Sequence, residues 1–167
     1  MKKRILIGIF VLLAAVCIVG VLATRPTKII GEDGLITKAR EEITDLAEVE
    51  TIEMSIVGKS TADNSRQLFW IITGNEYQMH RYYALEVTEA KNGAYEFVKL
   101  HKGNERAQDI FFANFAGGYS FIINNPKCES LILDGIAVPV AEIPFVYSCS
   151  QVPNEYCFLD ADGDELH

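Results

Sequence analysis

The sequence predicts a mainly β protein: an antiparallel β-sandwich or small barrel built from successive hairpins, preceded by a short helix and an N-terminal transmembrane helix. Three observations lead to this fold class. A basic N-terminus is followed by a long apolar run without charge. One short amphipathic stretch comes next, and beyond residue 50 short runs rich in Ile, Val, Phe, Tyr and Thr alternate with turn residues.

The apolar run is Ile5–Ala23, 19 residues without a charged side chain, a proline or an amide. As a helix rising about 1.5 Å per residue it would cover roughly 28 Å, close to the thickness of the hydrocarbon core of a bilayer. Apolar side chains occupy every face, so the helix needs lipid or a core larger than this chain can build. We therefore expect residues 1–24 to be an uncleaved signal anchor that contacts the membrane through Ile5–Ala23.

Two alternatives for this segment stay open. The tripeptide Val21–Ala23 fits a signal-peptide cleavage site, and cleavage after Ala23 would give a secreted protein. Lipid attachment at Cys17 fits less well, because the apolar run continues beyond it. For the anchor, the basic residues Lys2–Arg4 place a short N-terminus in the cytoplasm and the rest of the chain outside, in a single-pass topology.

The exported part is acidic. The whole chain has a net charge of −8, and residues 1–24 contribute three basic side chains and no acidic one, so the charge of the remainder is more negative still. Nucleic acids and anionic lipid headgroups are bound by clustered Lys and Arg. We therefore expect no nucleic-acid partner, while a protein or a cell-wall component stays open as the partner.

The segment between the anchor and the β-rich part has two expected pieces. Residues 25–35 are predicted to be a tether, because Pro26, Gly31 and Gly34 interrupt it. Thr37 would then cap a helix of two or three turns, whose apolar residues recur at helical spacing: Ile36, Ala39, Ile43, Leu46 and Ala47. This helix would begin the extracytoplasmic β domain, residues 36–167.

Beyond residue 50 we expect short strands joined by tight turns. The strands are predicted near 50–57, 66–73, 77–89, 94–101, 108–116, 119–124, 130–133, 136–140, 143–149, 155–160 and 164–166. Several are separated by dipeptides that readily adopt positive φ: Gly74-Asn75, Asn92-Gly93, Gly117-Gly118, Asp134-Gly135 and Asp162-Gly163. No helical stretch long enough for a parallel crossover follows, so neighbouring strands should be antiparallel. The continuous apolar runs at 68–72 and 121–123 are typical of central strands covered on both faces.

The tetrapeptide Gly58–Thr61 (GKST) resembles the end of a phosphate-binding loop. That loop requires another glycine five residues earlier, where this chain has Glu53, and a helix directly afterwards. The residues that follow indicate a turn instead. We interpret the tetrapeptide as a polar loop between two strands, and we expect no cofactor.

The acidic stretch near the C-terminus resembles the start of a calcium-binding loop. Asp160, Asp162 and Asp164 alternate as oxygen ligands would, but the twelve-residue loop needs Gly at its sixth position, where this chain has Glu165. A hairpin turn explains the spacing without a metal. A partly hydrated calcium site on the three aspartates is the alternative.

The chain has four cysteines, and Cys17 lies in the apolar run, which leaves three in the exported part. A hairpin centred on Pro153 would place Cys149 opposite Cys157, and opposed residues about 4.5 Å apart at Cα are within reach of a disulfide. The alternative is that Cys128, Cys149 and Cys157 are all reduced and half-buried.

Residues for acid–base chemistry are scarce. The chain has three histidines, and no strand–turn–helix elbow presents a serine as a nucleophile. His80 is the histidine that folding could bring to a serine and an acid, although a structural or surface role is the simpler interpretation. The tyrosines and phenylalanines are expected to form the core between sheets rather than an exposed binding cluster.

These features favour a non-enzymatic, membrane-tethered extracytoplasmic module that binds a protein or a cell-wall component. The layout is typical of bacterial envelope proteins. The alternatives are a hydrolase with a site assembled from scattered Ser, Asp and His80, and a structural envelope protein. No catalytic or cofactor-binding residue is expected.

Overall fold

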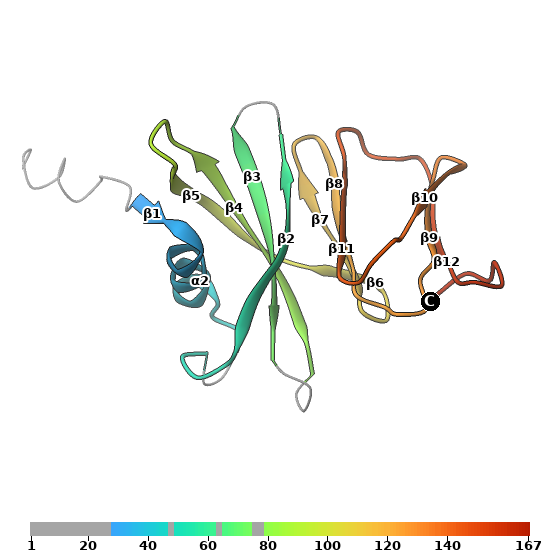
Figure 1. The fold of residues 1–167 in the computed structure, drawn as a ribbon, viewed down its shortest axis with the longest axis horizontal. Coiled ribbons are helices and arrows are strands. Elements are labelled where there is room, and N and C mark those ends of the chain that lie inside the picture. The colour runs from blue at the N-terminus through green and yellow to red at the C-terminus, as the bar shows by residue number, and fades with distance from the viewer. Residues whose placement is uncertain (1–27, 47–48, 63–64, 75–78) are drawn as a thin grey trace, which may run out of the picture.

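The structure is a computed structural model that describes residues 28–46, 49–62, 65–74 and 79–167. Its elements follow one another in this order along the chain (Figure 1): β1 (Lys28–Ile30), α2 (Gly31–Glu42), β2 (Met54–Thr61), β3 (Arg66–Thr73), β4 (Arg81–Glu89), β5 (Ala94–Lys102), β6 (Asn104–Ala107), β7 (Ile110–Phe115), β8 (Gly118–Ile123), β9 (Ser130–Leu133), β10 (Ile136–Pro139), β11 (Phe145–Cys149) and β12 (Tyr156–Leu159). The described residues include no helix that is long and apolar enough to cross a membrane. The predicted span, Ile5–Ala23, lies outside them.

The strands form three sheets in which every pair of neighbours is antiparallel. Sheet A has the order β1-β5-β4-β3-β2, sheet B has the order β11-β8-β7-β6, and sheet C has the order β10-β9-β12. Figure 1 shows the helix, sheet A, sheet B and sheet C following one another along the longest axis of the molecule. The predicted mainly β class, the antiparallel pairing and the short helix are confirmed. The stacking of open sheets is consistent with the sandwich among the two predicted arrangements.

Sheet A is covered on both faces, since its strand β3 carries apolar side chains on both of them. Phe69 and Ile71 belong to the core cluster that includes Leu35 and Ala39 of the helix. The alternate residues of β3 belong to the cluster shared with sheet B, with Leu68, Trp70, Ile72, Tyr82, Ala84, Ala113, Phe115 and Ile122 as its buried members. The continuous apolar run at 68–72 is therefore a central strand, as predicted, and each large side chain buried there contributes about 1.5–3 kcal/mol.

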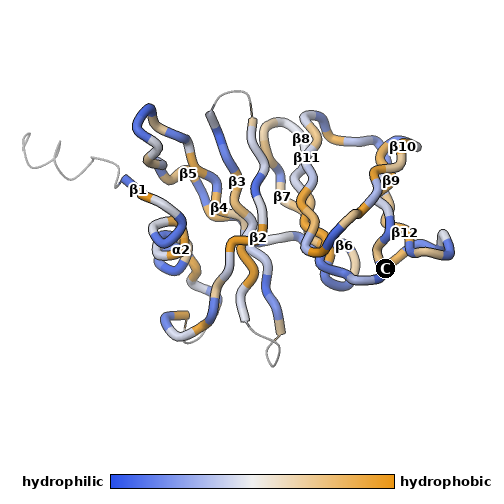
Figure 2. The backbone as a smooth tube through the Cα atoms, in the orientation of Figure 1, coloured by the Kyte–Doolittle hydropathy of each residue, from blue (hydrophilic) through white to orange (hydrophobic). Residues whose placement is uncertain are grey.

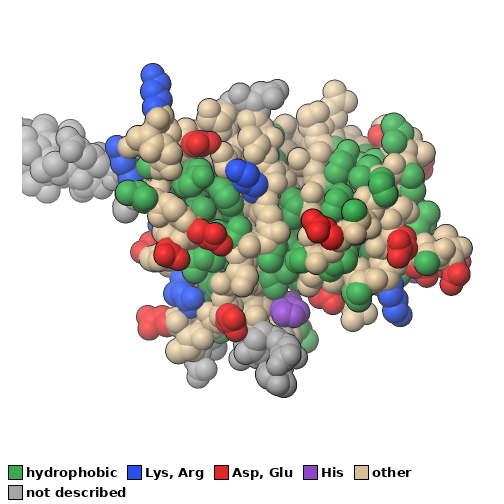
Figure 3. All heavy atoms as spheres, in the orientation of Figure 1, with side chains coloured by type: hydrophobic (Ala, Val, Ile, Leu, Met, Phe, Trp, Pro, Cys, Tyr) green, Lys and Arg blue, Asp and Glu red, His purple; other side chains and the backbone are tan. Residues whose placement is uncertain are grey.

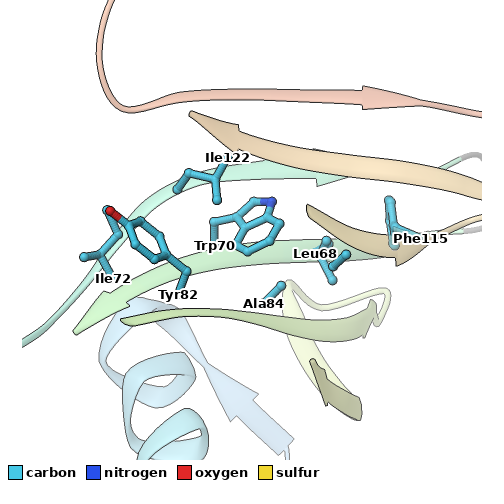
Figure 4. Close-up of a cluster of buried hydrophobic side chains, with 8 residues drawn as sticks. Leu68, Trp70, Ile72, Tyr82, Ala84, Phe115 and Ile122 are labelled. Atoms are coloured by element: carbon cyan, nitrogen blue, oxygen red, sulfur yellow. The ribbon is translucent and has the colours of Figure 1, made fainter. Parts of the chain in front are cut away.

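A buried hydrogen-bond link joins sheets A and B. The Trp70 indole nitrogen Nε1 donates to the Ser120 hydroxyl at 2.8 Å, and the hydroxyls of Ser60 and Ser120 lie 2.8 Å apart. Ser60 is 3% exposed, and Trp70 and Ser120 are fully buried. Figure 4 shows the Trp70 ring between the strands of the two sheets, with the helix on the far side of sheet A. The link satisfies polar groups that would otherwise be unpaired in the core.

The two sheets also meet closely where β2 passes β11. The register of β2 against β3 shifts between Ile56 and Gly58, which marks a β-bulge. A Cβ atom on Gly58 would lie 2.6 Å from Cγ2 of Val146 in β11, a distance that real contacts essentially never show. Glycine at this position therefore allows the close approach.

Sheets B and C enclose a second core that is rich in aromatic rings. Its fully buried or nearly buried members are Ala107, Ile110, Phe121, Ile123, Cys128, Leu131, Leu133 and Phe158. Phe121 contacts Phe158 edge-on with ring centroids 5.9 Å apart, and Tyr156 edge-on at 5.2 Å. Figure 2 shows hydrophobic stretches along the strands and hydrophilic residues at the hairpin between β4 and β5.

Several turns lie where the sequence predicts them. Asp134 and Gly135 have φ values of 46° and 80° between β9 and β10, which is the pair of positive φ angles that a type I′ turn requires. The turn between β4 and β5 contains Gly93 at φ 72°. The turn predicted at Gly74-Asn75 falls partly outside the described residues.

Three expectations differ from the structure. The stretch Lys28–Leu35, expected as part of a tether, forms β1 and the start of α2, and Ile29 and Leu35 are 4% and 2% exposed. The GKST stretch, expected as a loop, ends strand β2. The strand expected at 108–116 is present as β7, but the strand β6 before it was not expected; Ala107 pairs with Ile110, so β6 and β7 form a hairpin.

Removing the Ser120 hydroxyl tests the link between the sheets. Ser120→Ala leaves the Trp70 N–H and the Ser60 hydroxyl buried without their partner, which should lower the free energy of unfolding by about 1–3 kcal/mol. Ser60→Ala is the matched control, because it keeps the bond from Trp70 and should cost less. Urea unfolding can be followed by the fluorescence of Trp70, the one tryptophan of the chain. Equal destabilisation by both variants would contradict the role of Ser120 as the shared acceptor.

Candidate functional site

A cleft of about 520 Å³ opens where sheets A and B meet at their ends. Clefts of this size are typical of sites for small molecules. The described residues that line it come from the β2–β3 hairpin, the β7–β8 turn and the end of β11: Thr61, Ala62, Arg66, Phe115, Ala116, Gly117, Ser148, Cys149 and Ser150. In Figure 1 these segments lie at the upper ends of their strands. Segments far apart in the sequence therefore form one concave surface.

The turn that forms one wall of the cleft depends on small residues. Ala116 and Gly117 have φ values of 52° and 86°, so both adopt the left-handed conformation that a tight hairpin turn needs. A Cβ atom on Gly118 would lie 2.0 Å from the backbone oxygen of Cys149. The Ala-Gly-Gly sequence thus allows both the turn and the close approach of β8 to the end of β11.

Arg66 is the charged side chain among the described residues that line the cleft. The lining also carries the hydroxyls of Thr61, Ser148 and Ser150, all exposed, and the buried ring of Phe115. The chain as a whole has 23 acidic and 15 basic side chains. Figure 3 shows acidic side chains spread over sheet A as well as over sheets B and C. A lining with an arginine and, within the described residues, no carboxylate therefore departs from the charge of the rest of the surface.

Arg66 is paired with a buried carboxylate. Its Nη2 atom donates to Oε1 of Glu86, and the Glu86 side chain is 3% exposed while that of Arg66 is 36% exposed. The other carboxylate oxygen, Oε2, lies 2.8 Å from Nε2 of His101, whose side chain is 13% exposed. A carboxylate removed from water destabilises the fold unless partners of this kind surround it.

The pairing of strands brings these three residues together. Glu86 of β4 lies opposite Leu68 of β3, and Leu68 points into the core shared with sheet B. His101 of β5 lies opposite Ala84, which belongs to the same core. Arg66 precedes Leu68 by two residues, and successive side chains of a strand point to opposite faces, so Arg66, Glu86 and His101 share one face of sheet A. We call these three residues the Glu86 cluster.

His101 is held in its neutral form. Burial lowers the pKa of the imidazole below its ordinary value of 6.5, and the positive charges of Lys99 and Arg66 lower it further. The Glu86 carboxylate favours the protonated ring, but its charge is already compensated by Arg66. Neutral His101 therefore donates its Nε2 hydrogen to Glu86 without adding a charge to the cluster.

His80, the histidine that the sequence analysis considered for a catalytic site, lies outside the Glu86 cluster. Nδ1 of His80 is 3.3 Å from the backbone oxygen of Thr73, and His80 is not among the described residues that line the cleft. His101, next to the β5–β6 turn, is the histidine that contacts a carboxylate. The signal that could have found it is Glu86, a carboxylate inside the otherwise uncharged run Tyr82–Val87 of a central strand. Such a buried charge implies partners on the neighbouring strands.

The three C-terminal aspartates form a turn. Oδ1 of Asp160 accepts hydrogen bonds from the backbone N–H groups of Asp162 at 3.0 Å and Asp164 at 2.9 Å. Gly163 completes the turn at φ 85°. Within the described ranges, no group of three or more His, Cys, Asp or Glu side chains is placed to hold a metal ion.

Cys149 and Cys157 lie in different sheets. Cys149 of β11 is paired with Tyr119 of β8, whereas Cys157 of β12 is paired with Ile132 of β9, so the hairpin expected to oppose the two cysteines does not form. Both are free thiols in the structure, as is Cys128. Burial raises the pKa of the Cys128 thiol to about 11, so this group stays protonated and is a poor nucleophile.

Comparison of the chain with protein-family models, with curated proteins and with solved structures finds no significant match.

The lowered pKa of His101 predicts how stability depends on pH. The unfolded chain takes up a proton near pH 6.5, whereas folded His101 resists protonation until the pH is lower. Acid therefore favours the unfolded chain, and the free energy of unfolding should fall as the pH drops below about 6.5. We expect His101→Gln to flatten this dependence in urea unfolding measured at a series of pH values.

His80→Gln is the matched control for this measurement, because it removes a histidine and leaves the Glu86 cluster intact. If His101→Gln and the wild type lose stability in parallel as the pH falls, His101 does not contribute the predicted dependence.

Proposed function

We propose that the chain is a membrane-anchored extracytoplasmic binding module without catalytic activity of its own. The binding role rests on one observation, the cleft of about 520 Å³ between sheets A and B. The anchor rests on the sequence of Ile5–Ala23, whose apolar length matches a bilayer. The partner reached by the cleft would be a protein or cell-wall component outside the cytoplasm.

The lining of the cleft supports binding over catalysis. It offers hydroxyl groups, a guanidinium and an apolar ring, which orient a ligand, and it is supplied by strand ends and a two-residue turn. A serine nucleophile requires a base within hydrogen-bonding reach. Among the described residues, neither Ser148 nor Ser150 forms a hydrogen bond with a histidine, and Nε2 of His101 is engaged by Glu86. The hydrolase alternative therefore has less support than the binding module.

A charge in the middle of the apolar run tests the anchor. We expect the full-length protein to sediment with membranes, to resist alkaline extraction and to be cleaved by protease added from outside. Leu13→Lys should weaken membrane retention, because Lys at the centre of a spanning helix costs about 2.5–3.5 kcal/mol. Leu13→Met is the control that keeps the run apolar. A wild-type protein found in the cytosolic fraction would overturn the anchor, and a mature N-terminus at Thr24 would show a secreted product instead.

Filling the cleft tests the binding role. Ser148→Trp places a large ring in the cleft, whereas Ser55→Trp adds the same ring at an exposed position outside the lining. We expect envelope components that co-purify with the full-length protein to be retained by the wild type and Ser55→Trp but lost from Ser148→Trp, with circular dichroism confirming that both variants are folded. Equal retention by all three proteins would show that the cleft is not the binding surface.

A further inference from the structure

We propose that sheet C docks a second partner on its outer face: a protein segment that carries apolar side chains between basic ones. The outer face is the side of sheet C that points away from sheet B, and it is formed by Ser130, Ile132, Ala137, Pro139, Cys157 and Leu159. None of these six is among the described residues that line the cleft. The outer face is therefore a separate surface, and the proposal does not rest on the binding role of the cleft.

The register of sheet C places these six side chains on one face. Leu131, Val138 and Phe158, one from each strand, pack in the core shared with sheet B. Because side chains alternate along a strand, their neighbours point away from that core. The outer residues form two rows across the three strands: Ala137, Ile132 and Cys157 in one row, and Pro139, Ser130 and Leu159 in the other.

The outer face lacks the polar side chains that a sheet turned toward water normally carries on that side. Ser130 is the polar residue among the six, and the face has no charged side chain. Ala137 and Pro139 are exposed, the other four are half-buried, and none of the six belongs to a core cluster of the described residues. Sheet C is the last layer along the longest axis in Figure 1. An apolar face in this position is typical of an interaction surface.

The net charge of the chain is concentrated around this face. Residues 129–167 contain eight acidic side chains and no Lys or Arg, whereas the rest of the chain contains 15 of each sign. The segment that forms sheet C and β11 thus accounts for the whole net charge of −8. Its acidic residues are Glu129, Asp134, Glu142, Glu155, Asp160, Asp162, Asp164 and Glu165. Figure 3 shows hydrophobic side chains at the surface of this end of the molecule, with acidic side chains among them.

Acidic residues flank the outer face at both ends of its strands. At one end the backbone N–H of Glu129 donates to the carbonyl oxygen of Leu159, and Asp160 is the next residue of the chain. At the other end the backbone N–H of Asp134 donates to the carbonyl oxygen of Glu155 at 3.0 Å, and Oδ1 of Asp134 accepts the backbone N–H of Glu155 at 3.1 Å. An apolar surface with negative charge at both ends is complementary to a partner with positive charge at both ends of an apolar stretch.

The dimensions of the outer face fit a short helix. Glu129 and Asp134 are five residues apart along β9, which corresponds to about 17 Å of extended chain. About eleven residues of an α-helix cover the same length. Apolar side chains four residues apart on a helix are separated by about 6 Å along its axis, close to the roughly 7 Å between the two rows of the outer face. The expected occupant is therefore an amphipathic helix of a protein partner, with Lys or Arg near both ends of its apolar side.

A second copy of the chain is the other occupant to test. Two outer faces in contact would bring their acidic ends together, and like charges placed against each other weaken an interface. The charge of the surrounding residues therefore favours a basic partner. Because an acidic protein attracts cations over much of its surface, the experiment must separate the outer face from the charge of the whole chain.

One pair of variants tests the apolar part of the outer face. Ile132→Thr places a hydroxyl at the centre of the face and keeps a β-branched side chain in the strand. Ile30→Thr is the matched control, because Ile30 is 74% exposed in β1, at the opposite end of the molecule.

A second pair of variants tests the charge. Glu129→Gln/Glu155→Gln removes one exposed carboxylate from each end of the outer face, and neither is the aspartate that accepts backbone hydrogen bonds there. Glu50→Gln/Glu53→Gln is the matched control, because it removes two exposed carboxylates just before β2 of sheet A. Circular dichroism confirms that each variant is folded.

The probe is a short, fluorescently labelled helical peptide of Leu and Lys with an apolar and a basic side. It is titrated with the full-length protein in phosphatidylcholine nanodiscs, and empty nanodiscs give the background. We expect saturable binding to the wild type and to both control variants, and binding at least about threefold weaker to Ile132→Thr and to Glu129→Gln/Glu155→Gln. The same peptide with Glu in place of Lys should not bind.

Thiol labelling locates the bound peptide. Cys157 lies on the outer face and Cys149 lines the cleft, and both are half-buried free thiols. Saturating peptide should slow the alkylation of Cys157 by N-ethylmaleimide and leave the rate at Cys149 unchanged, with mass spectrometry to assign the modified residue.

Several results would overturn the proposal: equal binding by Ile132→Thr and the wild type, equal binding of the Glu peptide, equal weakening by Glu50→Gln/Glu53→Gln, protection of Cys149 instead of Cys157, or no binding of the Lys peptide. Self-association of the wild type that Ile132→Thr abolishes would also overturn it, because the occupant would then be a second copy. None of these measurements depends on Ser148→Trp, so the roles of the cleft and of the outer face are decided separately.

Discussion

The apolar character of β3 on both of its faces is the constraint on which the rest of the structure depends. A strand with Phe69 and Ile71 on one side and Leu68, Trp70 and Ile72 on the other must be covered twice. The helix supplies one cover and sheet B supplies the other. Sheet B is a thin layer with its own apolar outer face, so it requires sheet C in turn. The sequence of layers follows from this need to bury each exposed apolar face.

The cleft lies where the face of sheet A that contacts sheet B changes from apolar to polar side chains. Along one face of β3 and β4, the apolar residues that pack on sheet B give way to Arg66 and Glu86. Beyond the apolar core a carboxylate can remain charged only with partners from β3 and β5, and Arg66 and His101 are those partners. The same geometry places the guanidinium at the opening between the two sheets. The fold therefore determines both the position of the cleft and the charge at its edge.

Turn dipeptides and apolar runs, which act over a few residues of the chain, predicted several elements correctly. Positive φ at Asp134 and Gly135 produced a hairpin as expected, and the apolar run of β3 was a central strand. The helix began earlier than expected, because Gly31 and Gly34 were interpreted as breaks. In the structure Gly34 lies against Ile29, with Cγ2 of Ile29 3.1 Å from the position of a Cβ atom, so tertiary packing outweighs the low helix propensity of glycine.

Two features explain what the sequence could not predict: a turn without the usual dipeptide signals, and the register between paired strands. The hairpin of β6 and β7 turns at Asp109, a non-glycine residue at φ 57°, and that turn carries none of the usual dipeptide signals. The Glu86 cluster comes from three strands, and a register shift between Glu86 and Val87 changes which residues of β5 lie opposite. Because a shift of one residue reverses the face on which each side chain lies, the cluster could not be assigned without the register.

The position of β1 links the proposed anchor to the cleft. Lys28 begins β1 five residues after Ala23, and five residues reach at most about 18 Å when fully extended. With Ile5–Ala23 in a bilayer, the edge of sheet A that carries β1 would therefore be held close to the membrane surface.

Figure 1 shows β1 and sheet C at opposite ends of the molecule, with the seam of sheets A and B between them. A cleft at that seam is separated from β1 by the width of sheet A, since β1 and β2 are its two edge strands and β2 borders the cleft. If the proposed anchor holds, so short a connection would restrain the domain at the edge opposite the cleft and would leave the cleft facing away from that restraint.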